Sequence, residues 1–251
     1  FFKSKKANRF VGTIFGTLVF TPYDKWHNQH LKHHATVGNL DKRGVGDVWT
    51  MTKEEFEASD KRTRFRYKIY RNPFIMFSIG PIAVFLITNR LTYKWMTKKE
   101  KTSIWITNAA LLVIFIGMGF SIGFVTFLII QILILYFAAI AGFWLFYLQH
   151  QYEDVAWYRQ EKWDFKTVAL EGSSYVKFPM LLQWFSGNIG FHHIHHMNAR
   201  IPNYNLSKCY KEFPVFQEVK PITFLLSMKS LTFRLWDEKL QKLVGYSNKE
   251  Q

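Results

Sequence analysis

The stretch from Thr102 to Tyr152, TSIWITNAALLVIFIGMGFSIGFVTFLIIQILILYFAAIAGFWLFYLQHQY, contains no Asp, Glu, Lys or Arg. A helix needs about 20 apolar residues to cross the hydrocarbon core of a bilayer. The run is therefore long enough for two spans, and the glycine-punctuated segment GMGFSIG at 117–123 is the expected turn between them. The sequence thus predicts an integral membrane protein with a transmembrane hairpin over 104–148.

Two shorter stretches also lack charge. Residues 72–89 contain Pro73, Gly80 and Pro81, and residues 10–23 are fewer than a full span requires. If the histidine clusters on either side of the hairpin form one site, an even number of spans must separate them. We therefore expect 72–89 to be a re-entrant or interfacial segment, with a true span as the alternative.

Charge and apolarity are segregated along the chain. The sequence is 49% hydrophobic, yet 33 Lys and Arg against 18 Asp and Glu give a formal net charge of +15. The basic residues gather beside the apolar runs, at 3–9, 61–71 and 94–101, and the positive-inside rule places such segments in the cytoplasm. A nucleic-acid partner would also need basic residues, but the charge-free run favours lipid headgroups or an acidic protein partner.

Eight of the nine histidines lie in two clusters, WHNQHLKHH at 26–34 and GFHHIHH at 190–196. Each cluster contains the spacing H-x-x-H-H, whose three histidines share one face of a helix. Imidazole suits iron, copper, zinc and nickel, so two such faces together predict a site for one or two transition-metal ions. A solvated polar face or a structural zinc site is the alternative. The expected box ligands are His30, His33, His34, His192, His195 and His196.

The two boxes and the residues around them resemble the membrane fatty acid desaturases. The segments that carry the likeness are WHNQHLKHHATVGNLDKRGVGDVWTMT at 26–52, YRNPFIMFSIGPIAVFLITNR at 70–90 and EGSSYVKFPMLLQWFSGNIGFHHIHH at 171–196. Within the family they are most similar to the bacterial acyl-lipid desaturases of the Bacillus phospholipid type. The resemblance implies two iron ions with O2 as co-substrate, and it adds the lone His150 as a seventh ligand after the last span.

The resemblance also implies a fold and a division of the chain. The expected fold is an all-α integral membrane protein whose cytosolic helical cap carries a histidine-ligated di-iron site. In a single desaturase domain over 1–251, residues 1–71 are cytosolic or interfacial with the second histidine box, and 149–251 form the cap with the third. The first box of the family, H-D-x-x-H, is absent, and Phe1 and Phe2 are similar to the pair that follows it. A chain beginning at Phe1 is therefore expected to lack two ligands and to be inactive.

Other polar residues near the boxes are candidates for orienting the ligands. Metal-bound imidazoles usually donate their second ring N–H to a carboxylate or a carbonyl. His193 points away from its neighbours on a helix, so it is expected to support the ligands and not to bind metal itself. His27 lies one turn before His30 and could reach the site, but the family usually has a different residue there, so it is a weaker candidate ligand. Each of the other candidates has an ordinary helix cap or salt bridge as its alternative. They are Asp41, Asp47, Glu153, Asp154, Glu171 and Asn188.

The family likeness implies desaturation of fatty acyl chains, with a membrane phospholipid or another acyl lipid as substrate. No haem or flavin domain is visible in the sequence, so electrons are expected from a separate donor such as ferredoxin or flavodoxin. The plasma membrane is the expected location, with both boxes facing the cytoplasm and no nucleic acid involved. The alternatives are a related di-iron hydroxylase or ketolase, and a histidine-rich metal transporter, which the few neutral polar groups in the hairpin argue against.

Two features concern the end of the chain. Cys209 is the only cysteine, which excludes a disulfide framework and a C-x-x-C metal site. The segment LTFRLWDEKLQKLV at 231–244 has apolar residues at helical spacing, and it predicts an amphipathic helix on the cytosolic side.

Overall fold

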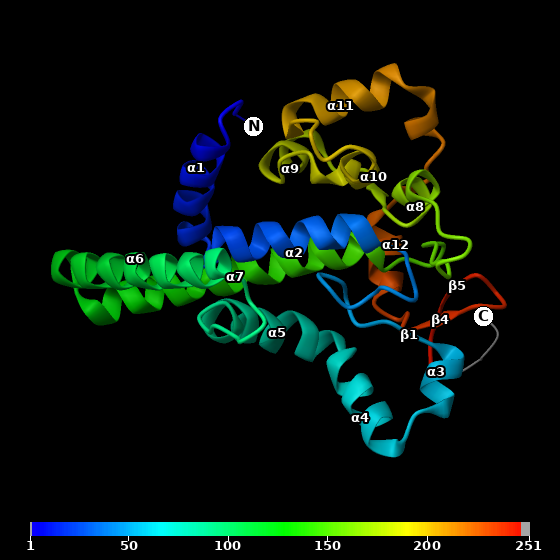
Figure 1. The fold of residues 1–251 in the computed structure, drawn as a ribbon, viewed down its shortest axis with the longest axis horizontal. Helices are drawn as coiled ribbons and strands as arrows, with labels where there is room; N and C mark the ends of the chain where they lie inside the picture. The colour runs from blue at the N-terminus through cyan, green and yellow to red at the C-terminus, as the bar shows by residue number, and fades with distance from the viewer. Residues whose placement is uncertain (1, 247–251) are drawn as a thin grey trace. The chain divides into compact units, whose positions relative to one another are not determined.

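A computed structural model describes residues 2–246, apart from the side chain of Phe224. It divides into two compact units, and the division runs through helices α2 and α7. The first unit comprises residues 1–32 and 72–144, and the second comprises 33–71 and 145–251. Figure 1 shows the elements in chain order.

All the regular elements among the described residues of the first unit are helices or helical turns. Its elements are α1 (Lys5–Leu18), the start of α2 (Tyr23–Thr36), the π-helical turn η1 (Ile75–Ile79), α5 (Gly80–Ile82), the π-helical turn η2 (Ala83–Thr88), α6 (Lys98–Ile122) and most of α7 (Phe124–His150). Helix α1 ends at Val19, where Thr21 N donates to Gly16 O and Phe20 N to Thr17 O. This pair of hydrogen bonds is typical of a helix C-terminus that is followed by a residue in the left-handed conformation. Phe20 takes that role at φ 56°.

Helices α6 and α7 follow one another as a hairpin, and near its turn the ring of Phe115 on α6 lies 5.4 Å from that of Phe124 on α7. A capping box between Thr97 and Glu100 begins α6, because each side chain satisfies a backbone N–H of the other's residue. Gly123 separates the two helices at φ 91°, which favours glycine, and a Cβ at Gly119 would lie 2.2 Å from the ring of Phe124. The turn expected over 117–123 is thus confined to Gly123, since residues 117–122 are still part of α6.

The surface of this hairpin is apolar. Phe120 is 82% exposed and Val125 is 72% exposed. Both helices are long and apolar enough to cross a membrane, and the interrupted pair Lys61–Tyr70 and Ile75–Thr88 would make a third span if it acts as one. The exposed apolar side chains of α6 and α7 suit the hydrocarbon core of a bilayer. Each helix also satisfies its own backbone polar groups, as that environment requires.

Residues 72–89 form a short, irregular helical segment. Pro81 lies between η1 and η2, and its ring nitrogen cannot donate to the preceding turn. Single π-helical turns are found where the regular hydrogen-bond ladder is interrupted. The segment accordingly differs from the regular α6 and α7.

The second unit combines short helices with two small sheets. Its helices are the end of α2, α3 (Lys53–Ala58), α4 (Lys61–Tyr70), the end of α7, α8 (Phe165–Glu171), α9 (Met180–Phe185), η3 (Ile189–Phe191), α10 (His192–Met197), α11 (Asn203–Glu212), η4 (Pro214–Gln217) and α12 (Phe224–Ser230). One buried cluster of its core gathers Leu40, Trp157 and Trp236, and another gathers Tyr175, Ile194 and Leu206.

The strands correct two predictions. Strand β1 (Met51–Thr52) is parallel to β4 (Leu235–Asp237), which is antiparallel to β5 (Lys242–Val244), and β2 (Tyr175–Val176) is parallel to β3 (Pro221–Ile222). The protein is thus mostly helical, but not all-α. The helix predicted over 231–244 is wrong, because β4 and β5 form a hairpin there. Asp237 Oδ1 accepts from the backbone of Lys239 and Leu240 and so stabilises the turn.

Candidate metal centre

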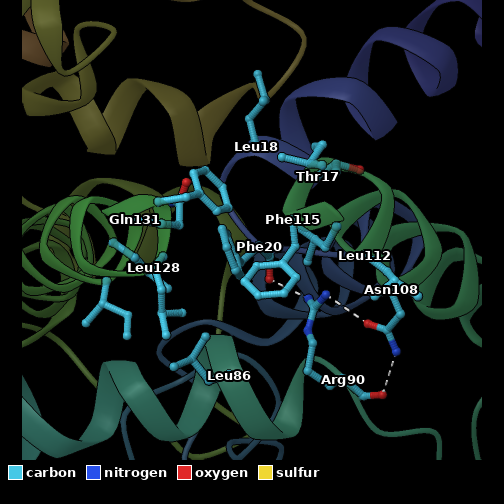
Figure 2. A pocket seen from close by; sticks show the side chains of 15 residues that line it. Thr17, Leu18, Phe20, Leu86, Arg90, Asn108, Leu112, Phe115, Leu128 and Gln131 are labelled. Atoms are coloured by element: carbon cyan, nitrogen blue, oxygen red, sulfur yellow. Dashed lines mark hydrogen bonds between the residues drawn. The ribbon is translucent and has the colours of Figure 1, made fainter. Parts of the chain in front are cut away.

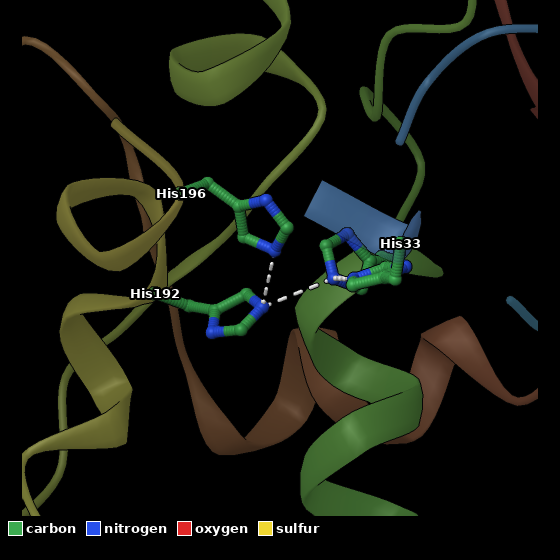
Figure 3. A group of neighbouring side chains, drawn as sticks. His33, His192 and His196 are labelled. Carbon is green, nitrogen blue, oxygen red and sulfur yellow. Dashed lines mark hydrogen bonds between the residues drawn. The ribbon is translucent and has the colours of Figure 1, made fainter. Parts of the chain in front are cut away.

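Four buried histidines of the second unit direct their Nε2 atoms at one point. His33 lies on α2, His150 is the last residue of α7, and His192 and His196 are one turn apart on α10. The Nε2 atom of His150 is 3.1 Å from that of His33 and 3.0 Å from that of His192, which is 3.0 Å from that of His196. Figure 3 shows this group. One ligand atom from each of the four lies within 4.8 Å of all the others.

The second ring nitrogens of His33 and His150 fix the tautomers. Nδ1 of His33 is 2.6 Å from Asp47 Oδ1, and Nδ1 of His150 is 2.9 Å from the carbonyl oxygen of Gly172. Both partners only accept hydrogen bonds, so each Nδ1 carries the proton. In neutral rings the two Nε2 atoms are then unprotonated and face each other. Two such lone pairs repel unless a cation lies between them.

The distances and the electrostatics suit a transition-metal ion. Two nitrogens about 2.1 Å from one ion and at right angles to each other lie about 3.0 Å apart. Burial, and after it the neighbouring imidazoles, holds the pKa of His192 and His196 well below the ordinary 6.5. Neutral imidazole is the form that binds metal. The four residues therefore fit a metal ion.

A second pair of box histidines meets beside this group. Nε2 of His34 is 3.0 Å from Nε2 of His195, and the ring of His34 stacks on that of His196 with centroids 4.1 Å apart. Burial lowers the pKa of His195 to about 4. The last two histidines of each box thus contact those of the other box crosswise, His33 beside His196 and His34 beside His195.

His30 and His27 lie earlier on α2, in the first unit. His30 precedes His34 by one helical turn and stacks on Trp26, with ring centroids 4.9 Å apart. His27 is exposed and stacks on Tyr23 at 5.5 Å.

Of the carboxylates considered from the sequence, Asp47 contacts a candidate ligand. Asp41 instead accepts from Arg159 and from the backbone of Gln160. Glu153 pairs with Lys229, and the carboxylate of Glu171 accepts from the hydroxyl of Tyr158. A cavity of about 750 Å³ in the second unit is lined by Glu153, Asp154 and Glu171 among others. These three carboxylates line its wall.

The other two candidates bond elsewhere. Nε2 of His193 is 3.1 Å from the carbonyl oxygen of Phe216, and burial lowers the pKa of this fully buried histidine to about 4. Asn188 adopts a left-handed conformation at φ 60° and donates to the carbonyl of Asn203. The sequence reasoning missed the Gly172 carbonyl, because no side-chain pattern marks a backbone acceptor.

A buried arginine supports the end of α7 next to His150. Arg71 is 1% exposed, and its guanidinium donates to Gln151 Oε1 at 2.7 Å and to the carbonyl of Phe233 at 3.1 Å. Gln151 in turn donates to Thr50 Oγ1 at 3.1 Å. The bonds of Gln151 to Arg71 and to Thr50 fix the position of the residue that immediately follows His150.

Comparisons with known proteins identify the family of the chain. A family model described as "Fatty acid desaturase" matches residues 1–223. The chain is 44% identical over 246 residues to a fatty acid desaturase of Bacillus subtilis, covering 98% of this chain and 70% of the relative. It is 26% identical to an sn-1 acyl-lipid omega-3 desaturase (ferredoxin) of Synechocystis, covering 88% and 60%. An sn-1 oleoyl-lipid 12-desaturase of Anabaena variabilis is also 26% identical, with 84% and 60% covered. The chain therefore belongs to the fatty acid desaturase family.

Proposed function

We propose that the protein introduces a cis double bond into the acyl chains of membrane lipids, with O2 as the oxidant. The observation that carries this proposal is the set of four buried imidazoles whose Nε2 atoms converge within 4.8 Å, in a chain of the desaturase family. A bound pair of iron ions would activate O2 and supply an oxidant that amino-acid side chains cannot furnish. Two electrons and two protons are consumed with each O2, and two molecules of water leave with each double bond formed.

The histidines divide into two candidate sets of ligands. His33, His150, His192 and His196 hold the first ion, since their nitrogens converge. His34 and His195 hold the second, and the spacing of α2 adds His30 one turn before His34. Asp47 and Gly172 keep the protons on Nδ1 of His33 and His150, so that both Nε2 atoms stay available. Burial of the imidazoles keeps water away from the reacting carbon atoms.

We further propose that the substrate is an acyl lipid, specifically a membrane phospholipid. Two relatives are named as acyl-lipid or oleoyl-lipid desaturases, and the exposed apolar hairpin suits a protein that meets its substrate in the bilayer. One relative is named for ferredoxin, which supports a separate ferredoxin or flavodoxin as electron donor. The basic segments favour a plasma-membrane protein with both boxes in the cytoplasm.

Fatty-acid analysis of cells that express the complete gene, including the segment expected to carry the first histidine box, tests this function. We expect monounsaturated acyl chains to accumulate in the phospholipid fraction, and to be absent when His196 is replaced by alanine. Purified wild-type protein should contain about two irons per chain by metal analysis. Hydroxylated or oxidised chains without new double bonds would instead identify a related di-iron hydroxylase or ketolase.

A further inference from the structure

A cavity of about 520 Å³ lies within the first unit, between the end of α1, η2, α6 and α7. Figure 2 shows the side chains around it. Most of the lining is apolar and includes Leu86, Leu112, Phe115 and Leu128. This volume is within the range of cavities that bind small molecules, and none of the seven candidate histidine ligands is among its lining residues.

One end of the cavity carries a positive charge. Arg90 donates to the carbonyl of Phe20 at 2.6 Å and to Asn108 Oδ1 at 2.9 Å, and Asn108 donates back to the carbonyl of Arg90 (Figure 2). Its Nε atom is buried and has no hydrogen-bond partner within residues 2–246. The guanidinium is therefore held in place by neutral oxygens, with one donor unused.

A second cation lies close to the first. Lys25 is 5% exposed, and its amine donates to the carbonyl of Thr88 at 2.6 Å and to Asn89 Oδ1 at 3.1 Å. Burial, and then the charge of Arg90, lowers its pKa to about 8, with Glu100 opposing the effect. Over the described residues, neither Lys25 nor Arg90 forms an ion pair with a carboxylate. Two neighbouring cations that bond only to neutral oxygens attract an anion.

We propose that this cavity binds an anionic phospholipid, with the phosphate at Arg90 and one acyl chain along Leu112, Phe115 and Leu128. Arginine presents its N–H groups in a fork that matches phosphate oxygens, and an ionised residue among apolar helices marks a binding site. Asn108 and Phe115 are separated by about 10 Å along α6. The distance between the charged end and the apolar end of the cavity thus matches the distance between the headgroup of a phospholipid and its acyl chain. This site does not depend on the proposed reaction.

Lipid binding can be measured on the full chain in nanodiscs that contain equal amounts of phosphatidylcholine and phosphatidylglycerol. After release into detergent, native mass spectrometry counts the lipids that stay bound. We expect one phosphatidylglycerol per chain, retained in preference to phosphatidylcholine. Arg90→Gln should lower the bound fraction at least about fivefold, because charge-assisted bonds to phosphate are lost.

Two further variants separate binding from folding. Leu112 lines the cavity and is not a hydrogen-bond partner of Arg90, so Leu112→Trp should fill the cavity and lower the bound fraction by a similar factor. Arg66 is exposed on α4, and the matched control Arg66→Gln should leave binding unchanged. Equal retention of both lipids by the wild type would overturn the proposal. If Leu112→Trp lowers the fraction of bound lipid and Arg90→Gln does not, the assignment of Arg90 to the phosphate is overturned.

Discussion

Nδ1 of His33 lies 2.6 Å from Oδ1 of Asp47, and the two side chains are 1% and 5% exposed. This contact joins α2 to the loop that follows it and fixes which nitrogen of His33 faces the other three imidazoles. A buried carboxylate in this position orients the ring and increases its basicity as a ligand. Asp47 is therefore a positioning residue of the candidate centre.

We expect Asp47→Ala to weaken metal binding about 10- to 100-fold, the usual effect of removing such a partner. Asp47→Asn should lose less, because its amide oxygen still accepts from Nδ1 but carries no charge. Iron content after dialysis against graded chelator measures the difference. The control is Asp41→Asn, since Asp41 is bonded to Arg159. Equal iron retention by Asp47→Ala and the wild type would contradict the assigned role.

His150 distinguishes the candidate centre from a site made of the two boxes alone. His150→Ala should remove one ligand, the imidazole that Nε2 of both His33 and His192 faces, so iron content and desaturation should both be lost. His27→Ala is the matched control, because His27 is exposed and stacks on Tyr23. Full activity of His150→Ala would show that the lone histidine is not a ligand.

Arg71 should contribute to the stability of the second unit. Arg71→Met leaves the buried acceptor Gln151 Oε1 without its guanidinium donor, and such a loss costs about 1–3 kcal/mol. We expect a clear fall in the midpoint of thermal unfolding, together with weaker iron binding, because Gln151 follows His150. The exposed Arg66→Met should change neither measurement. An unchanged midpoint in Arg71→Met would contradict the prediction.

Lys25 should make the stability of the first unit depend on pH. Its pKa is lowered from 10.5 to about 8 in the folded chain, so between these values the unfolded chain binds more protons. The free energy of unfolding should therefore increase as the pH rises from about 8 to 10.5. Thermal unfolding at a series of pH values should show this slope in the wild type and a weaker one in Lys25→Met. Equal slopes would exclude Lys25 as the cause.

Membrane orientation can be tested by cysteine labelling. With Cys209 replaced by serine, Phe120→Cys places a thiol near the turn of the hairpin and Lys98→Cys places one at the start of α6. The basic segments predict that Phe120→Cys reacts with an impermeant reagent from outside, while Lys98→Cys reacts only after the membrane is opened. Outside labelling of Lys98→Cys would show that 72–89 crosses the membrane.

Several features followed from sequence alone because they depend on local spacing. The charge-free run from Thr102 to Tyr152 predicted two long apolar helices, since a bilayer span is a matter of length and composition. The repeated H-x-x-H-H spacing predicted faces of imidazoles, since helical periodicity alone places residues three and four apart together. The family likeness rested on the same residues, and the comparisons confirm it.

Tertiary structure decided the features that depend on residues far apart in the chain. His33 is grouped with His150, 117 positions away, and Asp47 contacts an imidazole, whereas Asp41 is bonded to Arg159 and Glu171 to Tyr158. The segment at 231–244 has helical spacing, yet β4 pairs with Met51 and Thr52 from the other end of the second unit. Strand formation depends on such partners more than on intrinsic preference. Which carboxylate or carbonyl meets a histidine is likewise set by packing, because no local pattern encodes a long-range contact.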